Sequence, residues 1–137
     1  MNYSESLGYL DGLGKFGIKL GMERIEGLLR ELGNPEQKLK TVHVTGTNGK
    51  GSVTSMITNI LLAANLKVGK FTSPHLVKYN ERITLNGKDI SDDDFAMVIS
   101  AVKVAADSIV KKGVCEQPTQ FEILTAAAFL YFLSLIQ

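Results

Sequence analysis

The chain has 137 residues with a net charge of +1, a hydrophobic content of 45% and a charged content of 21%, which suits one soluble globular domain. The near-zero charge predicts neither nucleic acid nor a membrane surface as a partner. No apolar run reaches the ~18 residues of a membrane span. The N-terminus is acidic and lacks the basic start of a signal peptide. Cys115 is the only cysteine, so an intrachain disulfide is excluded and we expect a cytoplasmic protein.

The first half of the chain predicts a strand, a helix and a second strand after an initial helix. Apolar residues recur at helical spacing over 22–32, and the glycine-rich residues 12–21 before them are expected to be a loop. The stretch TVHVT, residues 41–45, is typical of a short buried strand, in which His43 would be a satisfied core histidine. An apolar stripe over 53–64 predicts a helix, and KVGKFTS, residues 67–73, predicts a strand parallel to the first in a right-handed βαβ unit.

The second half predicts a hairpin and two capped helices. Asn86-Gly87 between alternating apolar flanks indicates a tight β-hairpin. Ser91 with Asp94 indicates one helix start, and Thr119 with Glu122 indicates another. The second helix, through residue 136, is apolar nearly all round and should be buried on both sides. A further strand is expected after it, so the fold class is α/β and the chain is expected to be part of a larger domain.

The most informative stretch is VHVTGTNGKGSV, residues 42–53. Glycines between a strand and a helix let backbone N–H groups converge on a phosphate, and Lys50 would add a point charge to it. Gly49 and Lys50 match the end of the usual G-x-x-x-x-G-K-[ST] loop, but Gly51 follows the lysine and Ser52 is displaced by one position. The alternative is a glycine-rich turn with a solvated lysine; the order of strand, loop and helix favours the phosphate loop.

Four segments carry a resemblance to a known family. HVTGTNGKGS resembles the ATP loop of the Mur ligase superfamily, and its K-G-S ending resembles the folate branch, folylpolyglutamate synthase and dihydrofolate synthase. Upstream, IKLGMERIEGLLRELGNP is similar to the N-terminal segment of that family. Downstream, KVGKFTSPHLVKYNERITLNGKDI is similar to its second strand, omega loop and hairpin, and TQFEILTAAAF to a later helix start.

The resemblance implies an α/β fold with a partial P-loop-type parallel sheet flanked by helices, together with a small β-hairpin. Residues 1–137 would be the N-terminal part of the ATP-binding domain, without its remainder and without the C-terminal glutamate-binding domain. The implied enzyme is a monomeric, ATP- and Mg²⁺-dependent ligase that joins L-glutamate to a folate or dihydropteroate carboxylate through an acyl phosphate, and the chain alone would be inactive.

The resemblance also assigns site residues. It implies ATP binding by Gly46, Thr47, Asn48, Gly49, Lys50, Gly51 and Ser52, with Lys50 also catalytic. It implies Ser73 as a metal ligand, Pro74, His75 and Arg82 in the omega loop, and pterin binding by Lys19, Leu20, Thr119, Gln120, Phe121 and Glu122.

Several of these residues have plainer interpretations from the sequence alone. Lys19 stands where family members carry an acidic residue. Phe121 could be a core residue, Glu122 simply the cap partner of Thr119, and His75 a surface imidazole. The pair Glu81-Arg82 could position the omega loop or face solvent.

Two other functions stay open. A non-catalytic nucleotide-binding module would need no further metal ligands, and the segments from which the family takes its acidic and histidine ligands have no counterpart in these residues. A small-molecule kinase with a divergent loop would want K-[ST] and a later acidic residue, and the sequence supplies neither.

Overall fold

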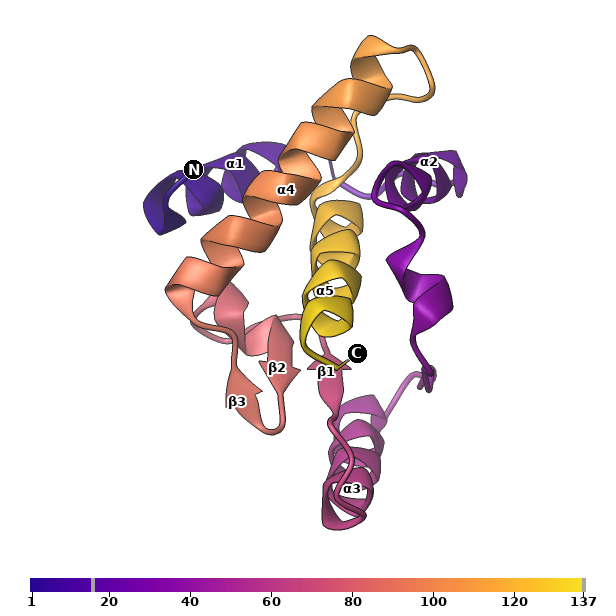
Figure 1. Cartoon of the computed structure of the whole chain (residues 1–137), viewed down its shortest axis with the longest axis vertical. Coiled ribbons are helices and arrows are strands. Elements are labelled where there is room, and N and C mark those ends of the chain that lie inside the picture. The colour runs from indigo at the N-terminus through magenta and orange to yellow at the C-terminus, as the bar shows by residue number, and fades with distance from the viewer. Residues whose placement is uncertain (16, 137) are drawn as a thin grey trace.

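The computed structural model describes residues 1–15 and 17–136. Its longer elements are α1 (Tyr3–Gly14), α2 (Glu23–Glu31), α3 (Lys50–Ala63), α4 (Asp92–Lys111) and α5 (Gln120–Ile136). Its strands are β1 (Gly69–Phe71), β2 (Ile83–Leu85) and β3 (Lys88–Asp89), and its 3₁₀ turns are η1 (Pro35–Lys38) and η2 (Tyr79–Arg82). Helices α4 and α5 form the centre, α1 and α2 flank them on opposite sides, and the small sheet and α3 lie toward one end (Figure 1).

The core lies where α4 and α5 meet. Both predicted helix starts are confirmed: the Ser91 hydroxyl accepts from the Asp94 N–H at 3.1 Å, and Thr119 and Glu122 exchange side-chain and backbone hydrogen bonds. Phe95, Ile99 and Val102 of α4 are fully buried. Ala126 and Ala127 of α5 are also fully buried, because their small side chains let neighbouring elements approach the helix closely. The expected burial of α5 is confirmed for its central part, whereas Phe121 near its start and Leu135 near its end are exposed.

The three strands form one antiparallel sheet in the order β1-β2-β3. The predicted hairpin is confirmed: Asn86 and Gly87 connect β2 to β3 with φ of 51° and 82°, the positive values that a tight hairpin turn requires. At the far edge of the sheet, β1 approaches α5 so closely that a Cβ on Gly69 would lie 2.5 Å from a ring carbon of Phe132. This contact joins the sheet to the helical core.

Residues 41–45 form no strand, and the parallel βαβ unit is not present in the described part of the chain. The expectation that His43 is a core histidine was wrong, because this residue is exposed. A strand needs a neighbour for its backbone N–H and C=O groups. The strand expected beside it, β1, pairs antiparallel with β2 instead. The apolar pattern of residues 41–45 therefore has no pairing partner here.

Helix α1 was missed by the sequence analysis, which placed a loop over residues 12–21. Asn2 caps the helix: its side chain accepts from the Glu5 N–H at 2.8 Å, and the Glu5 carboxylate accepts from the Asn2 N–H at 2.9 Å. Leu10 and Leu13 are buried in the core. Burial of this face stabilises the helix through Gly12 and as far as Gly14. The loop therefore begins only after Gly14.

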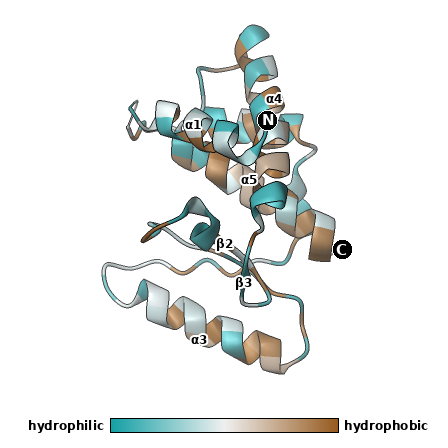
Figure 2. Ribbon diagram, turned by 90° about the vertical axis from the view of Figure 1, so that its left-hand side faces the viewer, coloured by the Kyte–Doolittle hydropathy of each residue, from teal (hydrophilic) through white to brown (hydrophobic). Residues whose placement is uncertain are grey.

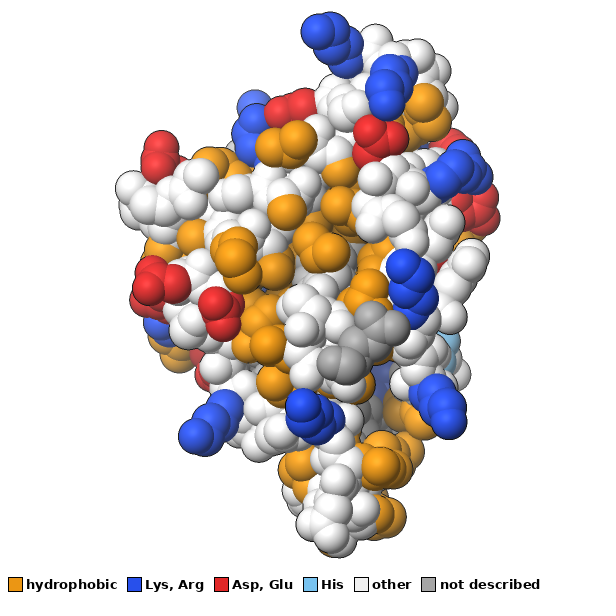
Figure 3. Space-filling model, viewed as in Figure 1, with side chains coloured by type: hydrophobic (Ala, Val, Ile, Leu, Met, Phe, Trp, Pro, Cys, Tyr) orange, Lys and Arg blue, Asp and Glu red, His pale blue; other side chains and the backbone are white. Residues whose placement is uncertain are grey.

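Helix α3 confirms the predicted helix but stands apart from the main body (Figure 2). Val53, Met56 and Ile60 are 42%, 58% and 68% exposed, so the apolar stripe of the helix faces solvent. Figure 3 shows hydrophobic side chains along α4 and α5 and a second group at the end of the molecule where α3 lies. None of the helices described is long and apolar enough to cross a membrane.

Candidate functional site

The glycine-rich loop lies at the start of α3. Gly49 is the N-cap with φ of 76°, and Gly46 has φ of 144°, conformations that favour glycine at both positions. No side chain caps this helix and its first turn carries no acidic residue, so the backbone N–H groups there are open to an anion. Lys50 begins the helix and is exposed, as are all residues from Gly46 to Ser52. This arrangement suits an oxyanion approaching from solvent.

A cavity of about 480 Å³ brings together segments far apart in the sequence. Its lining residues are Gly17, Ile18, Lys19, Ser73, Thr119, Phe121 and Glu122. Five of these seven are residues that the family resemblance assigned to pterin or metal binding. Phe121 is 51% exposed and its ring centroid lies 5.8 Å from that of Phe71, so it is a wall of the cavity rather than a core residue.

Glu122 is held firmly at one of its two carboxylate oxygens. Oε1 accepts from the Thr119 N–H at 2.9 Å and from Arg24 Nε at 3.0 Å, and these contacts leave Oε2 unused. Its role as cap partner of Thr119 is confirmed, but the cap occupies only half of the carboxylate. The hydrogen bond to Glu122 raises the pKa of Arg24. Glu122, which lines the cavity, thus has a second carboxylate oxygen that neither of these contacts uses.

Lys19, Leu20 and Gln120 complete the predicted pterin set, and of these three only Lys19 lines the cavity. Lys19 pairs with Glu116 at 3.3 Å, and the Leu20 side chain is 93% exposed. Gln120 does not line the cavity: its amide donates to the Leu10 carbonyl at 2.9 Å and to the Tyr79 hydroxyl at 2.8 Å. It therefore ties α5 to α1 and η2.

The omega loop, residues 73–82, is organised by Glu81. Its carboxylate accepts from the backbone N–H groups of Leu76, Val77 and Lys78 at 2.9, 3.0 and 2.9 Å. These hydrogen bonds hold the pKa of Glu81 below its usual range, and the one from Lys78 contributes most. Of the two interpretations of Glu81, positioning of the loop is the one that these contacts support.

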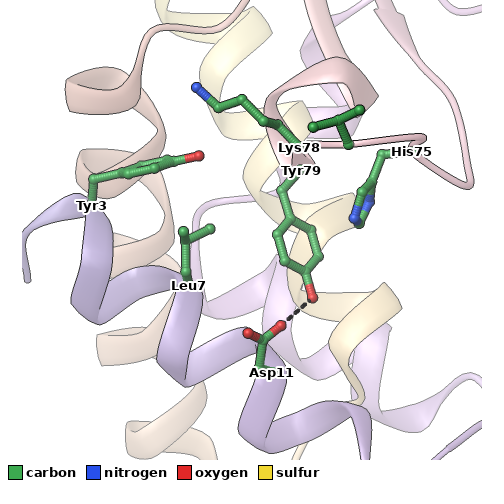
Figure 4. Close-up of a pocket in the computed structure, with 7 residues that line it drawn as sticks. Tyr3, Leu7, Asp11, His75, Lys78 and Tyr79 are labelled. Carbon is green, nitrogen blue, oxygen red and sulfur yellow. Dashed lines mark hydrogen bonds between the residues drawn. The ribbon is translucent and has the colours of Figure 1, made fainter.

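His75, Tyr79 and Arg82 form a second cluster of the omega loop. Arg82 Nε donates to His75 Nδ1 at 2.8 Å, and the rings of His75 and Tyr79 lie 4.4 Å apart. Burial lowers the pKa of Arg82. The Tyr79 hydroxyl donates to Asp11 of α1 at 2.8 Å, at the edge of a smaller cavity of about 300 Å³ (Figure 4). Burial, followed by this hydrogen bond, raises the pKa of Tyr79 to about 12.

Ser73 and Pro74 begin the omega loop and are joined by a cis peptide bond. Ser73 offers one neutral hydroxyl, which is a fitting but single oxygen ligand for Mg²⁺. Within residues 1–15 and 17–136, no three His, Cys, Asp or Glu side chains come together as a metal site. The residues present therefore do not complete a Mg²⁺ site by themselves.

Comparisons with known proteins match nearly the whole chain. A dihydrofolate synthase/folylpolyglutamate synthase of Bacillus subtilis is 42% identical over 95% of this chain and 30% of the relative. The solved folylpolyglutamate synthetase of Lactobacillus casei superposes with a TM-score of 0.89 at 37% identity, over 96% of this chain and 33% of the other. This chain is similar to the N-terminal part of folylpolyglutamate and dihydrofolate synthases. The resemblance drawn from the motifs is thereby confirmed.

Another folylpolyglutamate synthase structure, described as a complex with AMPPCP and folate, matches with a TM-score of 0.87 at 37% identity, over 96% of this chain and 32% of the other. No family model matches the chain. The chain spans about a third of the length of the synthases that it matches.

The structure also identifies residues near the cavity that the sequence analysis did not single out. Gly17 and Ile18 line it, and Arg24 contacts Glu122 from the start of α2. A basic residue in the first turn of a helix runs against the helix dipole, and this signal could have drawn attention to Arg24. Its partner Glu122 lies 98 positions away in sequence, so the contact itself has no local signature.

Proposed function

We propose that this chain is the N-terminal part of the ATP-binding domain of an ATP-dependent ligase that adds L-glutamate to a folate or dihydropteroate carboxylate. The observation that carries the proposal is the cavity that joins Lys19, Ser73, Thr119, Phe121 and Glu122. Those residues come from three separate segments that resemble the folate branch of the family. The similarity to synthases, one of them described as a complex with AMPPCP and folate, supports the same assignment.

The proposed reaction has two steps. The substrate carboxylate attacks the γ-phosphorus of ATP, ADP leaves, and an acyl phosphate forms. The glutamate amine then attacks the acyl carbon, phosphate leaves, and the amine loses a proton as the amide forms. The residues from Gly46 to Ser52 hold the phosphates through backbone N–H groups, and Lys50 balances the charge on the transferring group.

In the proposed pterin site, Phe121 offers an aromatic face to the ring and Glu122 Oε2 accepts from ring N–H groups. When bound, Mg²⁺ supplies further neutralisation of phosphate charge. Ser73 would hold the ion together with ligands from outside this chain, because one hydroxyl does not fill a six-oxygen shell. The substrates of the whole enzyme are therefore ATP, L-glutamate and a pteroate-type acid.

The domain arrangement belongs to the same proposal. In the full-length protein, residues 41–45 pair in a parallel P-loop-type sheet, and the apolar stripe of α3 packs against that sheet. Both features are exposed here, and both have the sequence pattern of buried elements. The remainder of the sheet and a C-terminal glutamate-binding domain would come from further chain.

The test is an assay of the full-length protein that contains this chain, with ATP, Mg²⁺, labelled glutamate, and dihydropteroate or a reduced folate in separate reactions. We expect a glutamylated product and ADP in equal amounts. ADP with a phosphorylated substrate and no glutamate incorporation would favour the kinase alternative. Nucleotide binding without turnover would favour the non-catalytic module.

A further inference from the structure

We propose that Arg24 is a positioning residue of the cavity: its guanidinium fixes the loop of residues 17–21 and the Glu122 carboxylate relative to each other. The inference rests on the proposed function, because it states that Arg24 maintains the shape of the proposed pterin site. Arg24 does not line the cavity itself. It acts through the two walls that do.

The first observation is the set of acceptors around one buried guanidinium. Arg24 is only 3% exposed. Its Nε donates to Glu122 at 3.0 Å and its Nη1 donates to Glu23 at 3.1 Å. Its Nη2 donates to the carbonyls of Lys19 and Leu20 at 2.9 and 3.2 Å. Four acceptors from the loop, from α2 and from α5 thus converge on one planar group.

The second observation is that the position is otherwise unfavourable for a cation. Arg24 lies in the first turn of α2, where the partial positive charge of the helix disfavours a basic side chain. Burial of an ion also costs free energy unless its hydrogen bonds are satisfied. A planar fork meets four acceptors in fixed directions, which the ammonium of a lysine cannot do. The contacts therefore require the geometry of arginine and not merely its charge.

The third observation is what the contacts leave available. Arg24 and the Thr119 N–H both use Oε1 of Glu122, which directs the carboxylate without occupying Oε2. The hydrogen bond from Arg24 to the Lys19 carbonyl fixes the position of the cavity wall formed by Gly17, Ile18 and Lys19. A site held in its binding geometry before the ligand arrives loses less conformational entropy on binding. Arg24 thus prepares both walls at once.

Gly21 offers an independent way to disturb the same clamp. Its φ is +110°, a backbone conformation that side-chain-bearing residues rarely adopt, and a Cβ there would also displace the exposed carboxylate of Glu23, which accepts from Arg24. The loop therefore turns back onto Arg24 only with glycine at this position. Gly21→Ala should reproduce the effect of changing Arg24 without removing the guanidinium.

The experiment compares Arg24→Lys, Arg24→Gln and Gly21→Ala in the full-length protein, with Arg30→Gln as the matched control. Arg30 is an exposed arginine on the same helix. We expect the KM for the pteroate substrate to rise about tenfold or more in the three test variants. A rise of this size corresponds to the loss of one or two charge-assisted hydrogen bonds. The KM for ATP should stay within about twofold, because the phosphate loop is untouched. The control should match the wild type.

Hydrogen exchange of the loop separates this inference from the proposed function. The amide of Gly17, which donates to the Gly14 carbonyl at 3.2 Å, should exchange faster in the test variants, while the amides of α4 keep their protection. If the wild type makes no glutamylated product, the proposed function fails, while faster exchange confined to the loop would still support the clamp. Unchanged exchange, unchanged KM for the pteroate substrate, or an equal rise of both KM values would overturn the role of Arg24.

Discussion

At the residue scale, the proposed phosphate loop carries a single side-chain charge. The backbone N–H groups at the start of α3 are present whatever the side chains are, but only Lys50 brings a full positive charge to the loop. Charge that develops on a transferring phosphoryl group is stabilised by groups placed there in advance. We therefore expect the loop backbone to contribute to phosphate binding and Lys50 to contribute to the rate.

Lys50→Ala in the full-length enzyme should lower kcat/KM for ATP by roughly 10²–10³-fold, the usual cost of removing one preorganised charge-stabilising group. Steady-state kinetics with saturating glutamate and folate measures this effect. Lys40→Ala is the control, because Lys40 is an exposed lysine upstream of the loop. A Lys50 variant with unchanged kcat/KM would contradict the assignment.

Ser73→Ala should raise the Mg²⁺ concentration required for half-maximal activity and leave the thermal unfolding midpoint unchanged. The reason is that Ser73 is exposed at the cavity and contributes a hydroxyl oxygen rather than packing. A Mg²⁺ titration of activity measures the shift. If the titration curve does not move, Ser73 is not a ligand and the assignment of this residue is wrong.

At the scale of the element, the omega loop owes its shape to one carboxylate that spans three consecutive N–H groups. Such a contact favours the ionised form, so the pKa of Glu81 is depressed in the folded protein. Stability from a depressed carboxyl pKa is present above the ordinary value of 4.5 and is lost as pH falls through the folded value. The order of the loop should therefore depend on pH in the acid range.

Glu81→Gln should lower the unfolding midpoint at pH 7, because the amide has one acceptor oxygen for three N–H donors. The difference from the wild type should shrink as the pH falls from about 4.5 through the lower folded pKa of Glu81, because the wild-type carboxylate becomes protonated over that range. Thermal unfolding at pH 7 and at pH 3.5 measures both effects, with Asp89→Asn as an exposed control on β3. A difference that is equal at both pH values would contradict the ionic role of Glu81.

The contact between β1 and α5 makes a second prediction at this scale. Gly69→Ala should destabilise the fold by about 1–3 kcal/mol, the usual cost of overpacking, because the added Cβ meets the buried ring of Phe132. Gly8→Ala is the matched control, for which we expect the opposite change in the free energy of unfolding. Gly8 lies within α1 with nothing close to the new methyl group, so the change should stabilise by about 0.5–1 kcal/mol. Denaturant unfolding measures both, and equal effects would contradict the packing argument.

At the scale of the whole molecule, the proposed site is divided between an exposed loop and a separate cavity. The phosphate loop lies on an exposed helix start, and none of its residues lines the cavity that holds Ser73. The apolar stripe of α3 faces solvent. An acyl phosphate formed on such a surface would be open to water.

The isolated chain should therefore not ligate glutamate, although the full-length enzyme should. Purified chain is assayed with ATP, Mg²⁺, labelled glutamate and a reduced folate, with the full-length protein as the positive control. The exposed α3 stripe should also promote self-association, which sedimentation measures directly. Turnover by the isolated chain near the full-length rate would overturn the proposal that further chain completes the site.

The sequence by itself determined the features that depend on neighbouring residues. The starts of α4 and α5 and the Asn86-Gly87 turn are confirmed because caps and positive φ angles are set within a few residues. The same kind of signal was present for α1, in Asn2 and Glu5, and was overlooked beside the glycines that follow.

Only the tertiary structure decided what depends on distant partners. It brought Lys19, Ser73 and Glu122 to one cavity and turned Gln120 away from it, and no local pattern specifies either outcome. It also left residues 41–45 unpaired, because a strand exists only where another strand satisfies its backbone. Arg24 shows the reason most directly. Its charge is evident in the sequence, but its role depends on a hydrogen bond to the carboxylate of Glu122, which lies 98 positions away.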